Sequence, residues 1–281
     1  MIVVTGATGN VGRPLVRAVA EAGHRVTSVS RGPAPADLPQ GAGHVRADLA
    51  APETLRPALQ GAEALFLHDG GAGGRGLDPR AILDVARGAG VRRVVLLSSQ
   101  GVVTRPESPS HGGVMRAIEE AVRESGLAWT ILRPGGFASN AYAWAESVRA
   151  ERTVAAPFGD VGIPVIDPAD IAEVAAVALA KDEHDGHVYE LNGPTAVTPR
   201  QQAEAIGVAL GEPVRFLELT REEAHVRMAA FLPEPVVETT LAVLGEPNAA
   251  ELRLSPDVER VLGRGPHSFA GWAYRNVEAF R

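Results

Sequence analysis

The chain has 281 residues, a formal net charge of −7 and no cysteine. This length allows one large α/β domain with a smaller appended region, while the acidic balance argues against nucleic acid or an anionic membrane surface as a partner. The lack of cysteine excludes disulfides, thiolate catalysis and cysteine-based metal sites. No apolar run is long enough to cross a bilayer, and a strand is expected from Ile2. We therefore expect a cytoplasmic protein without a signal peptide.

The first fourteen residues read MIVVTGATGNVGRP and predict a strand over residues 2–5, a tight loop and a helix. Three glycines follow the strand at a spacing of three. The first permits a sharp turn, the second lets the backbone approach a pyrophosphate, and the third lets the helix pack closely on the sheet. Free N–H groups in the first helical turn then face an anion. The pattern predicts a dinucleotide site that includes Gly6, Thr8, Gly9, Asn10, Val11 and Gly12.

The second strand is expected over residues 25–30, after a helix stop at Gly23. At the tip of this strand, an acidic residue binds the ribose 2′-hydroxyl of NAD, whereas an arginine accommodates the 2′-phosphate of NADP. This chain has Ser30 and Arg31 there and no acid. The pattern favours NADP(H), with Ser30 as a second contact, although an exposed loop arginine without a ligand is the alternative.

Strands and helices continue to alternate, which is typical of a doubly wound parallel sheet, the Rossmann fold. The Asp78-Pro79 and Asp167-Pro168 pairs each indicate a helix start with a cap followed by proline. Further strands are expected over residues 44–46, 64–67, 94–97, 129–132 and 188–191, and helices over residues 79–88, 111–124 and 168–180.

Ligands of open α/β sheets bind at the carboxyl ends of the strands, so residues at those ends are candidate contacts. Asp48 and Leu49 are expected near an adenine ring, and His68 directly follows the fourth strand. A bend after the sixth strand is expected beside the reactive end of the cofactor, where it presents Pro134, Gly135 and Phe137.

From Asn192 onward the alternation gives way mainly to helices, with capping boxes beginning at Thr198 and Thr220. We therefore predict an NAD(P)-binding Rossmann domain over residues 1–191 and a smaller, mainly helical substrate-binding lobe over residues 192–281. Residues from about 138 to 162 are expected to contribute to this lobe. Among them Asn140, Tyr142 and Trp144 are candidate substrate contacts, with a helix-start role for Asn140 and ordinary packing for the aromatic rings as alternatives.

His184 and His187, with Asp185 between them, have a spacing that superficially suits metal ligands. A glycine also lies between the two histidines, and charged residues flank them. These neighbours favour a solvated turn, so no metal site is expected.

Three segments resemble the NmrA-like branch of the atypical short-chain dehydrogenase/reductase superfamily. They are TGATGNVG (residues 5–12), SGLAWTILRPGGF (residues 125–137) and DPADIA (residues 167–172). The resemblance covers most of the chain and implies a Rossmann fold that binds NAD(P). It also implies hydride transfer, which most of the superfamily performs with a Tyr-x-x-x-Lys pair whose tyrosine supplies the proton.

That pair cannot exist in this chain. No tyrosine has a lysine four places on, because the sole lysine, Lys181, follows Val177 at that spacing. Where the predicted helix should present the pair, the sequence has His111 and Met115. The usual acid–base mechanism of the superfamily is therefore absent.

Ser98, Ser99 and His111 are the candidate catalytic residues, with bound water and the substrate's own hydroxyl as other proton sources. The two serines stand at the carboxyl end of the fifth strand, and a histidine titrates near neutral pH. The structural alternatives are hydroxyls that bond backbone groups at a strand end and a histidine at a helix start.

The sequence favours an NADPH-dependent oxidoreductase that transfers a hydride to a ketone or quinone. An aromatic polyketide-like substrate is preferred, because its ring delocalises the developing charge without a dedicated acid. A non-catalytic NADP-binding redox sensor is the alternative, and the oligomeric state is left open.

Overall fold

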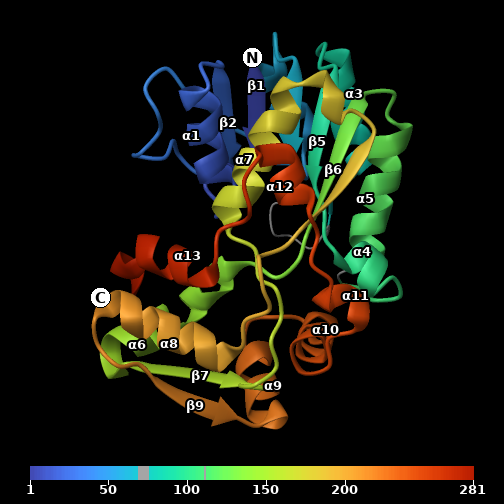
Figure 1. The fold of residues 1–281 in the computed structure, drawn as a ribbon. Coiled ribbons are helices and arrows are strands. Elements are labelled where there is room, and N and C mark those ends of the chain that lie inside the picture. The colour runs from blue at the N-terminus through green and yellow to red at the C-terminus, as the bar shows by residue number, and fades with distance from the viewer. Residues whose placement is uncertain (69–75, 111) are drawn as a thin grey trace.

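A seven-stranded sheet forms the centre of the computed structural model, which describes residues 1–68, 76–110 and 112–281. Its order is β3-β2-β1-β4-β5-β6-β8, and every neighbouring pair is parallel (Figure 1). The order reverses between β1 and β4, which confirms the doubly wound α/β fold. The strands are β1 (Ile2–Thr5), β2 (Val26–Ser30), β3 (Gly43–Arg46), β4 (Ala64–Leu67), β5 (Arg93–Leu97), β6 (Ala128–Pro134) and β8 (His187–Leu191).

Helices cover both faces of the sheet. One face carries α1 (Gly12–Glu21), α7 (Pro168–Ala180) and α12 (Asp257–Leu262), and the other carries α2 (Arg56–Leu59), α3 (Pro79–Gly88) and α5 (Gly112–Glu124). Leu15 and Val19 of α1 are fully buried with Val4 of β1, and each such side chain contributes about 1.5–3 kcal/mol of burial free energy. Across the described parts of the chain, no helix is both long enough and apolar enough to cross a membrane.

Side-chain caps determine where several helices begin. The carboxylates of Asp78 and Asp167 accept backbone N–H bonds from Ala81 and Ala169, at 3.0 and 2.8 Å. Capping boxes beginning at Thr198 and Thr220 start α8 (Pro199–Leu210) and α9 (Arg221–Ala229). These four predicted starts are confirmed. The sequence could predict them because each cap depends only on residues within one turn.

A smaller lobe lies at the carboxyl-end side of the sheet (Figure 1). It contains a two-stranded parallel sheet that the sequence did not reveal, in which β7 (Thr153–Pro157) pairs with β9 (Arg215–Leu219). Besides α8 and α9, the lobe contains the 3₁₀ helices η2 (Ala138–Trp144) and η4 (Val277–Phe280) and the helices α6 (Ala145–Glu151), α10 (Glu234–Gly245), α11 (Ala249–Leu252) and α13 (Phe269–Arg275). The lobe is therefore mainly helical, as predicted, but also has a short sheet.

The last part of the chain returns to the large domain. Val258 of α12 is buried in the same apolar cluster as α1 and α7. The fully buried Asp170 accepts a backbone N–H bond from His267 at 2.7 Å and pairs with Arg264 at 2.9 Å. Asp167 pairs with Arg275. The two acids of the DPADIA segment thus anchor residues 264–275, and the predicted domain boundary at residue 191 stays a prediction.

Candidate active site

The glycine loop after β1 folds tightly onto the start of α1. Gly6 adopts a left-handed conformation with φ of +61°, and its carbonyl accepts the N–H of Gly9 at 3.0 Å. A Cβ atom on Gly12 would lie 2.2 Å from the carbonyl oxygen of Gly6, so no side chain fits there. This close approach leaves a backbone cradle at a helix N-terminus, the arrangement that fits a pyrophosphate.

A cavity of about 460 Å³ opens around this loop, at the point where the strand order reverses. Every predicted cofactor contact lines it except Pro134 and Gly135: Gly6, Thr8, Gly9, Asn10, Val11, Gly12, Ser30, Arg31, Asp48, Leu49, His68 and Phe137. Its lining also includes Val29, Ala47, Ala50, Phe66 and Leu77, which sequence reasoning missed because apolar residues beside a strand end resemble ordinary core. We call this space the cofactor cavity.

The tip of β2 lies at the rim of the cofactor cavity. Ser30 Oγ donates to the carbonyl of Gly32 at 3.3 Å. Arg31 is exposed, and its side chain has no hydrogen-bond or ion-pair partner within residues 1–68, 76–110 and 112–281. After the neighbouring strand β3, Asp48 Oδ1 accepts the backbone N–H of Ala50 at 3.0 Å, which stabilises the turn there. The cationic side chain at this rim is therefore available to an anion.

A second cavity of about 220 Å³ shares His68 and Phe137 with the cofactor cavity. We call it the adjoining cavity. It brings together Ser98 and Ser99, the bend after β6 and one face of α5, including Met115. Its full lining is His68, Leu97, Ser98, Ser99, Ser110, Val114, Met115, Pro134, Gly135 and Phe137. His111, the third candidate catalytic residue, lies outside the described residues.

Ser98 and Ser99 have different hydrogen-bonding roles. Ser98 is buried, and its hydroxyl donates to Glu119 Oε1 at 2.6 Å. Ser99 Oγ accepts the backbone N–H of Gly101 at 3.1 Å, so its own proton stays available. A carbonyl oxygen in the adjoining cavity could receive a hydrogen bond from Ser99, whereas the proton of Ser98 is already committed.

A buried ion pair lies beneath these serines. Glu119 is 2% exposed and accepts bonds from Arg133 Nε at 2.9 Å and Nη2 at 2.6 Å. Burial alone raises the pKa of Glu119, but hydrogen bonds from Arg133 and Ser98 and the charge of Arg133 outweigh it and hold the pKa below its usual range. Sequence reasoning missed Glu119, since its segment reads like any amphipathic helix.

The predicted substrate contacts on η2 line neither of these two cavities. Tyr142 donates its hydroxyl to Asn276 Oδ1 at 2.6 Å, and its ring centroid lies 5.1 Å from that of Trp272. Trp144 packs against the apolar cluster that contains Trp272, while Asn140 is exposed. These packing contacts match the alternative that the sequence left open. Tyr142 also lines a third cavity, of about 490 Å³, which shares Thr8, Gly9 and Asn10 with the cofactor cavity, so the predicted substrate contacts stay a prediction.

The two histidines that superficially resembled metal ligands each have a local contact instead. Nδ1 of the buried His184 lies 2.8 Å from the hydroxyl of Tyr189. The exposed His187 stacks on the same tyrosine, with the ring centroids 5.7 Å apart. Their surroundings are those of a turn packed on β8.

Comparison with known proteins agrees with this geometry. Residues 6–182 match the model of an NAD(P)H-binding family. The chain is 35% identical over 290 residues to the (4-alkanoyl-5-oxo-2,5-dihydrofuran-3-yl)methyl phosphate reductase of Streptomyces griseus, covering 100% of this chain and 99% of the relative. It is 32% identical over 286 residues to an NAD(P)H azoreductase of Xenophilus azovorans, with coverages of 100% and 99%.

Among solved structures, an Escherichia coli NADPH-dependent quinone oxidoreductase complexed with NADPH has a similar fold. The TM-score is 0.80 at 26% identity, covering 98% of this chain and 99% of the other. The glycine loop, the strand order and these likenesses point to one assignment. The chain belongs to the NmrA-like family of atypical, NAD(P)H-binding short-chain dehydrogenases/reductases, and it is an NAD(P)H-dependent reductase.

Proposed function

We propose that this reductase uses NADPH to transfer a hydride to a ketone or quinone, with an aromatic polyketide-like compound as the preferred substrate. The observation that carries the proposal is the meeting of the cofactor cavity and the adjoining cavity at His68 and Phe137. A reduced nicotinamide supplies a hydride when it is bound, and a substrate in the adjoining cavity would lie next to that end of the cofactor.

The residues of the cofactor cavity have distinct roles in this proposal. The glycine loop, Gly6 to Gly12, binds the pyrophosphate at the N-terminus of α1. Asp48 and Leu49 flank the adenine. Arg31 binds the 2′-phosphate, a role supported by its exposed position at the rim and its lack of a partner among the described side chains.

The walls of the adjoining cavity suit an uncharged ring. Leu97, Val114 and Phe137 supply apolar surface, and Ser99 supplies a hydroxyl donor. Ser99 donates a hydrogen bond to the carbonyl oxygen as negative charge develops there, and solvent delivers the proton that completes the alcohol or hydroquinone. An azoreductase and a quinone oxidoreductase among the relatives support a conjugated acceptor.

Paired titrations with NADPH and NADH, followed by turnover with a panel of quinones and aromatic ketones, test the proposal. We expect NADPH to bind more tightly than NADH, and Arg31→Ala to raise the Kd for NADPH about tenfold, because one charge-assisted contact is lost. Arg25→Ala, which removes an exposed arginine at the other end of β2, is the matched control.

Equal binding of the two cofactors would remove the role of Arg31. Tight binding of NADPH without consumption by any acceptor would contradict the proposed reaction and favour the redox-sensor alternative.

A further inference from the structure

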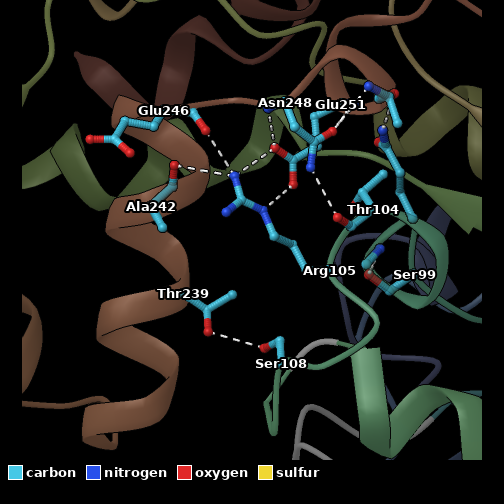
Figure 2. Close-up of polar contacts among 12 residues, drawn as sticks. Ser99, Thr104, Arg105, Ser108, Thr239, Ala242, Glu246, Asn248 and Glu251 are labelled. Carbon is cyan, nitrogen blue, oxygen red and sulfur yellow. Dashed lines mark hydrogen bonds and ion pairs between the residues drawn. The ribbon is translucent and has the colours of Figure 1, made fainter.

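The connector between β5 and α5, residues 98–110, is held from outside by the C-terminal lobe (Figure 2). Its Arg105 forms a two-pronged ion pair with Glu251 of α11, from Nε to Oε1 at 2.8 Å and from Nη2 to Oε2 at 2.9 Å. The same Nη2 donates to the carbonyl of Glu246 at 2.9 Å. The side chain of Glu251 is only 7% exposed, so the carboxylate of this pair is buried, while Arg105 is partly buried.

Other bonds join the same two segments. Asn248 Nδ2 donates to the carbonyl of Thr104 at 2.9 Å, and Gln100 Nε2 donates to the carbonyl of Ala250 at 3.1 Å. Asn248 and Glu251 also form the capping box of α11. The carboxylate that binds Arg105 is therefore itself fixed by the helix start, which makes it a rigid anchor.

On its inner side, the connector forms part of the adjoining cavity. Ser99 and Ser110, near its two ends, both line that cavity. At the start of α5, a Cβ atom on Gly112 would lie 2.1 Å from the carbonyl oxygen of Arg105, and the N–H of Gly113 donates to the carbonyl of Ser108 at 2.9 Å. The backbone at Arg105 thus sets where α5 begins.

Two cavity walls depend on that position. Val114 and Met115 of α5, which line the adjoining cavity, follow immediately after the packed glycines. On the opposite wall, a Cβ atom on Gly135 would lie 2.7 Å from Gln100 Oε1, so the connector also rests on the bend after β6. Neither Arg105 nor Glu251 lines the adjoining cavity or the cofactor cavity.

We propose that Arg105 and Glu251 are positioning residues for the reduction: their ion pair holds the connector and the start of α5 where they form the substrate cavity. This inference rests on the proposed assignment of the adjoining cavity to the substrate. The effect of the pair falls on substrate reduction and not on cofactor binding, because neither residue lines the cofactor cavity, whereas the connector that they hold lines the adjoining cavity.

Arg105→Gln and Glu251→Gln each break the paired contact, and glutamine at residue 251 still suits the capping box. We expect kcat/KM for the reducible substrate to fall about tenfold to a hundredfold, since small displacements of a binding wall have effects of this size. NADPH affinity is expected to stay at the wild-type value. Arg105→Lys keeps the charge but loses the planar fork, so it is expected to restore part of the loss.

Arg93→Gln is the control, since it removes another partly buried pair, Arg93 Nε to Asp185 Oδ1 at 2.8 Å, at the start of β5. It is expected to leave kcat/KM unchanged. The double variant Arg105→Gln/Glu251→Gln is expected to lose no more than either single variant, because both remove one shared interaction. Additive losses would overturn the proposal.

Hydrogen exchange of residues 98–110 provides a readout that needs no turnover. We expect faster exchange there in Arg105→Gln and Glu251→Gln, but not in Arg93→Gln. Wild-type exchange in folded variants, or wild-type kcat/KM despite faster exchange, would overturn the positioning role. If none of the acceptors oxidises NADPH in the presence of the wild-type protein, the proposed function is wrong. Hydrogen exchange would then still decide whether the ion pair holds the connector.

Discussion

Two neighbouring hydroxyls show how the site is differentiated at the scale of single residues. The hydroxyl of Ser98 donates a hydrogen bond to the buried Glu119, whereas Ser99 Oγ accepts a backbone N–H and its own O–H stays available. The sequence placed both serines at the carboxyl end of β5, because strand ends are recognisable from local patterns. It could not separate their roles, since the partner of Ser98 lies 21 residues away on α5.

Ser99→Ala is expected to lower kcat about a hundredfold, the usual effect of removing one donor to a developing oxyanion. Its free energy of unfolding is expected to fall by less than that of Ser98→Ala, because the Gly101 N–H that loses Ser99 Oγ is only partly buried. Ser98→Ala is expected to act mainly on stability, with a loss of about 1–3 kcal/mol, because Glu119 loses a donor in the interior. Steady-state kinetics and urea unfolding of both variants check this contrast; a larger kcat loss in Ser98→Ala would reverse the assignment.

Glu119 is expected to give the protein an acid-sensitive stability. Its pKa is below the usual range in the folded state, so the unfolded chain, with a pKa near 4.5, takes up the proton first as pH falls. The stabilisation is complete above that value and is lost as pH falls through the lower, folded-state pKa. Glu119→Gln should cost about 3 kcal/mol at neutral pH, since Arg133 is left unpaired.

Urea unfolding between neutral pH and pH of about 3 measures this effect. The difference between wild type and Glu119→Gln should narrow as the pH falls below about 4.5. Glu120→Gln, at the exposed neighbouring position on α5, serves as the control. If the difference in unfolding free energy between wild type and Glu119→Gln does not change with pH, the charge of the carboxylate contributes nothing to stability.

At the scale of elements, the glycine loop is the feature that the sequence specifies most completely. Its turn, its close approach and its helix start all depend on residues 6–12, so the prediction needed no distant partner. The pair β7 and β9 is the opposite case. Strand β7 reads TVAAP, which is short and has mostly small side chains, so it shows no alternation of apolar and polar residues. Its partner strand begins about sixty residues later, at Arg215.

Gly12→Ala is expected to abolish tight binding of NADPH, because the new Cβ atom would lie 2.2 Å from the carbonyl oxygen of Gly6 and displace the loop. The control is Gly88→Ala, at the exposed end of α3, where no atom lies within 4 Å of the added Cβ. That change should leave binding intact and stabilise the helix by about 0.5–1 kcal/mol. Fluorescence titration compares them, and tight NADPH binding by Gly12→Ala would contradict the loop's role.

At the scale of the whole molecule, the C-terminal part of the chain both builds the lobe and returns to the sheet. Asp170 on α7 binds His267 and Arg264, and Glu251 on α11 binds Arg105. The sequence located the DPADIA segment but could not show these partners, because each lies about a hundred residues or more away. A mainly helical lobe was predictable, and its attachment was not.

Asp170→Asn is expected to destabilise the protein by about 3 kcal/mol, because it removes the charge of a fully buried carboxylate that pairs with Arg264. Asp84→Asn breaks the exposed pair with Arg87 on α3 and should cost less than about 0.5 kcal/mol. Urea unfolding gives both values. Similar small losses of unfolding free energy in the two variants would mean that Asp170 does not anchor residues 264–275.

We propose that this protein binds NADPH in the cofactor cavity and passes its hydride to a carbonyl or quinone in the adjoining cavity. Single-turnover oxidation of NADPH, deuterated in turn at each of the two hydrogens of the nicotinamide C4 position, tests it most directly. We predict that a quinone or aromatic ketone consumes the bound cofactor and that only one of the two labels slows the step. If no acceptor oxidises bound NADPH faster than it oxidises NADPH without the protein, this reaction is wrong.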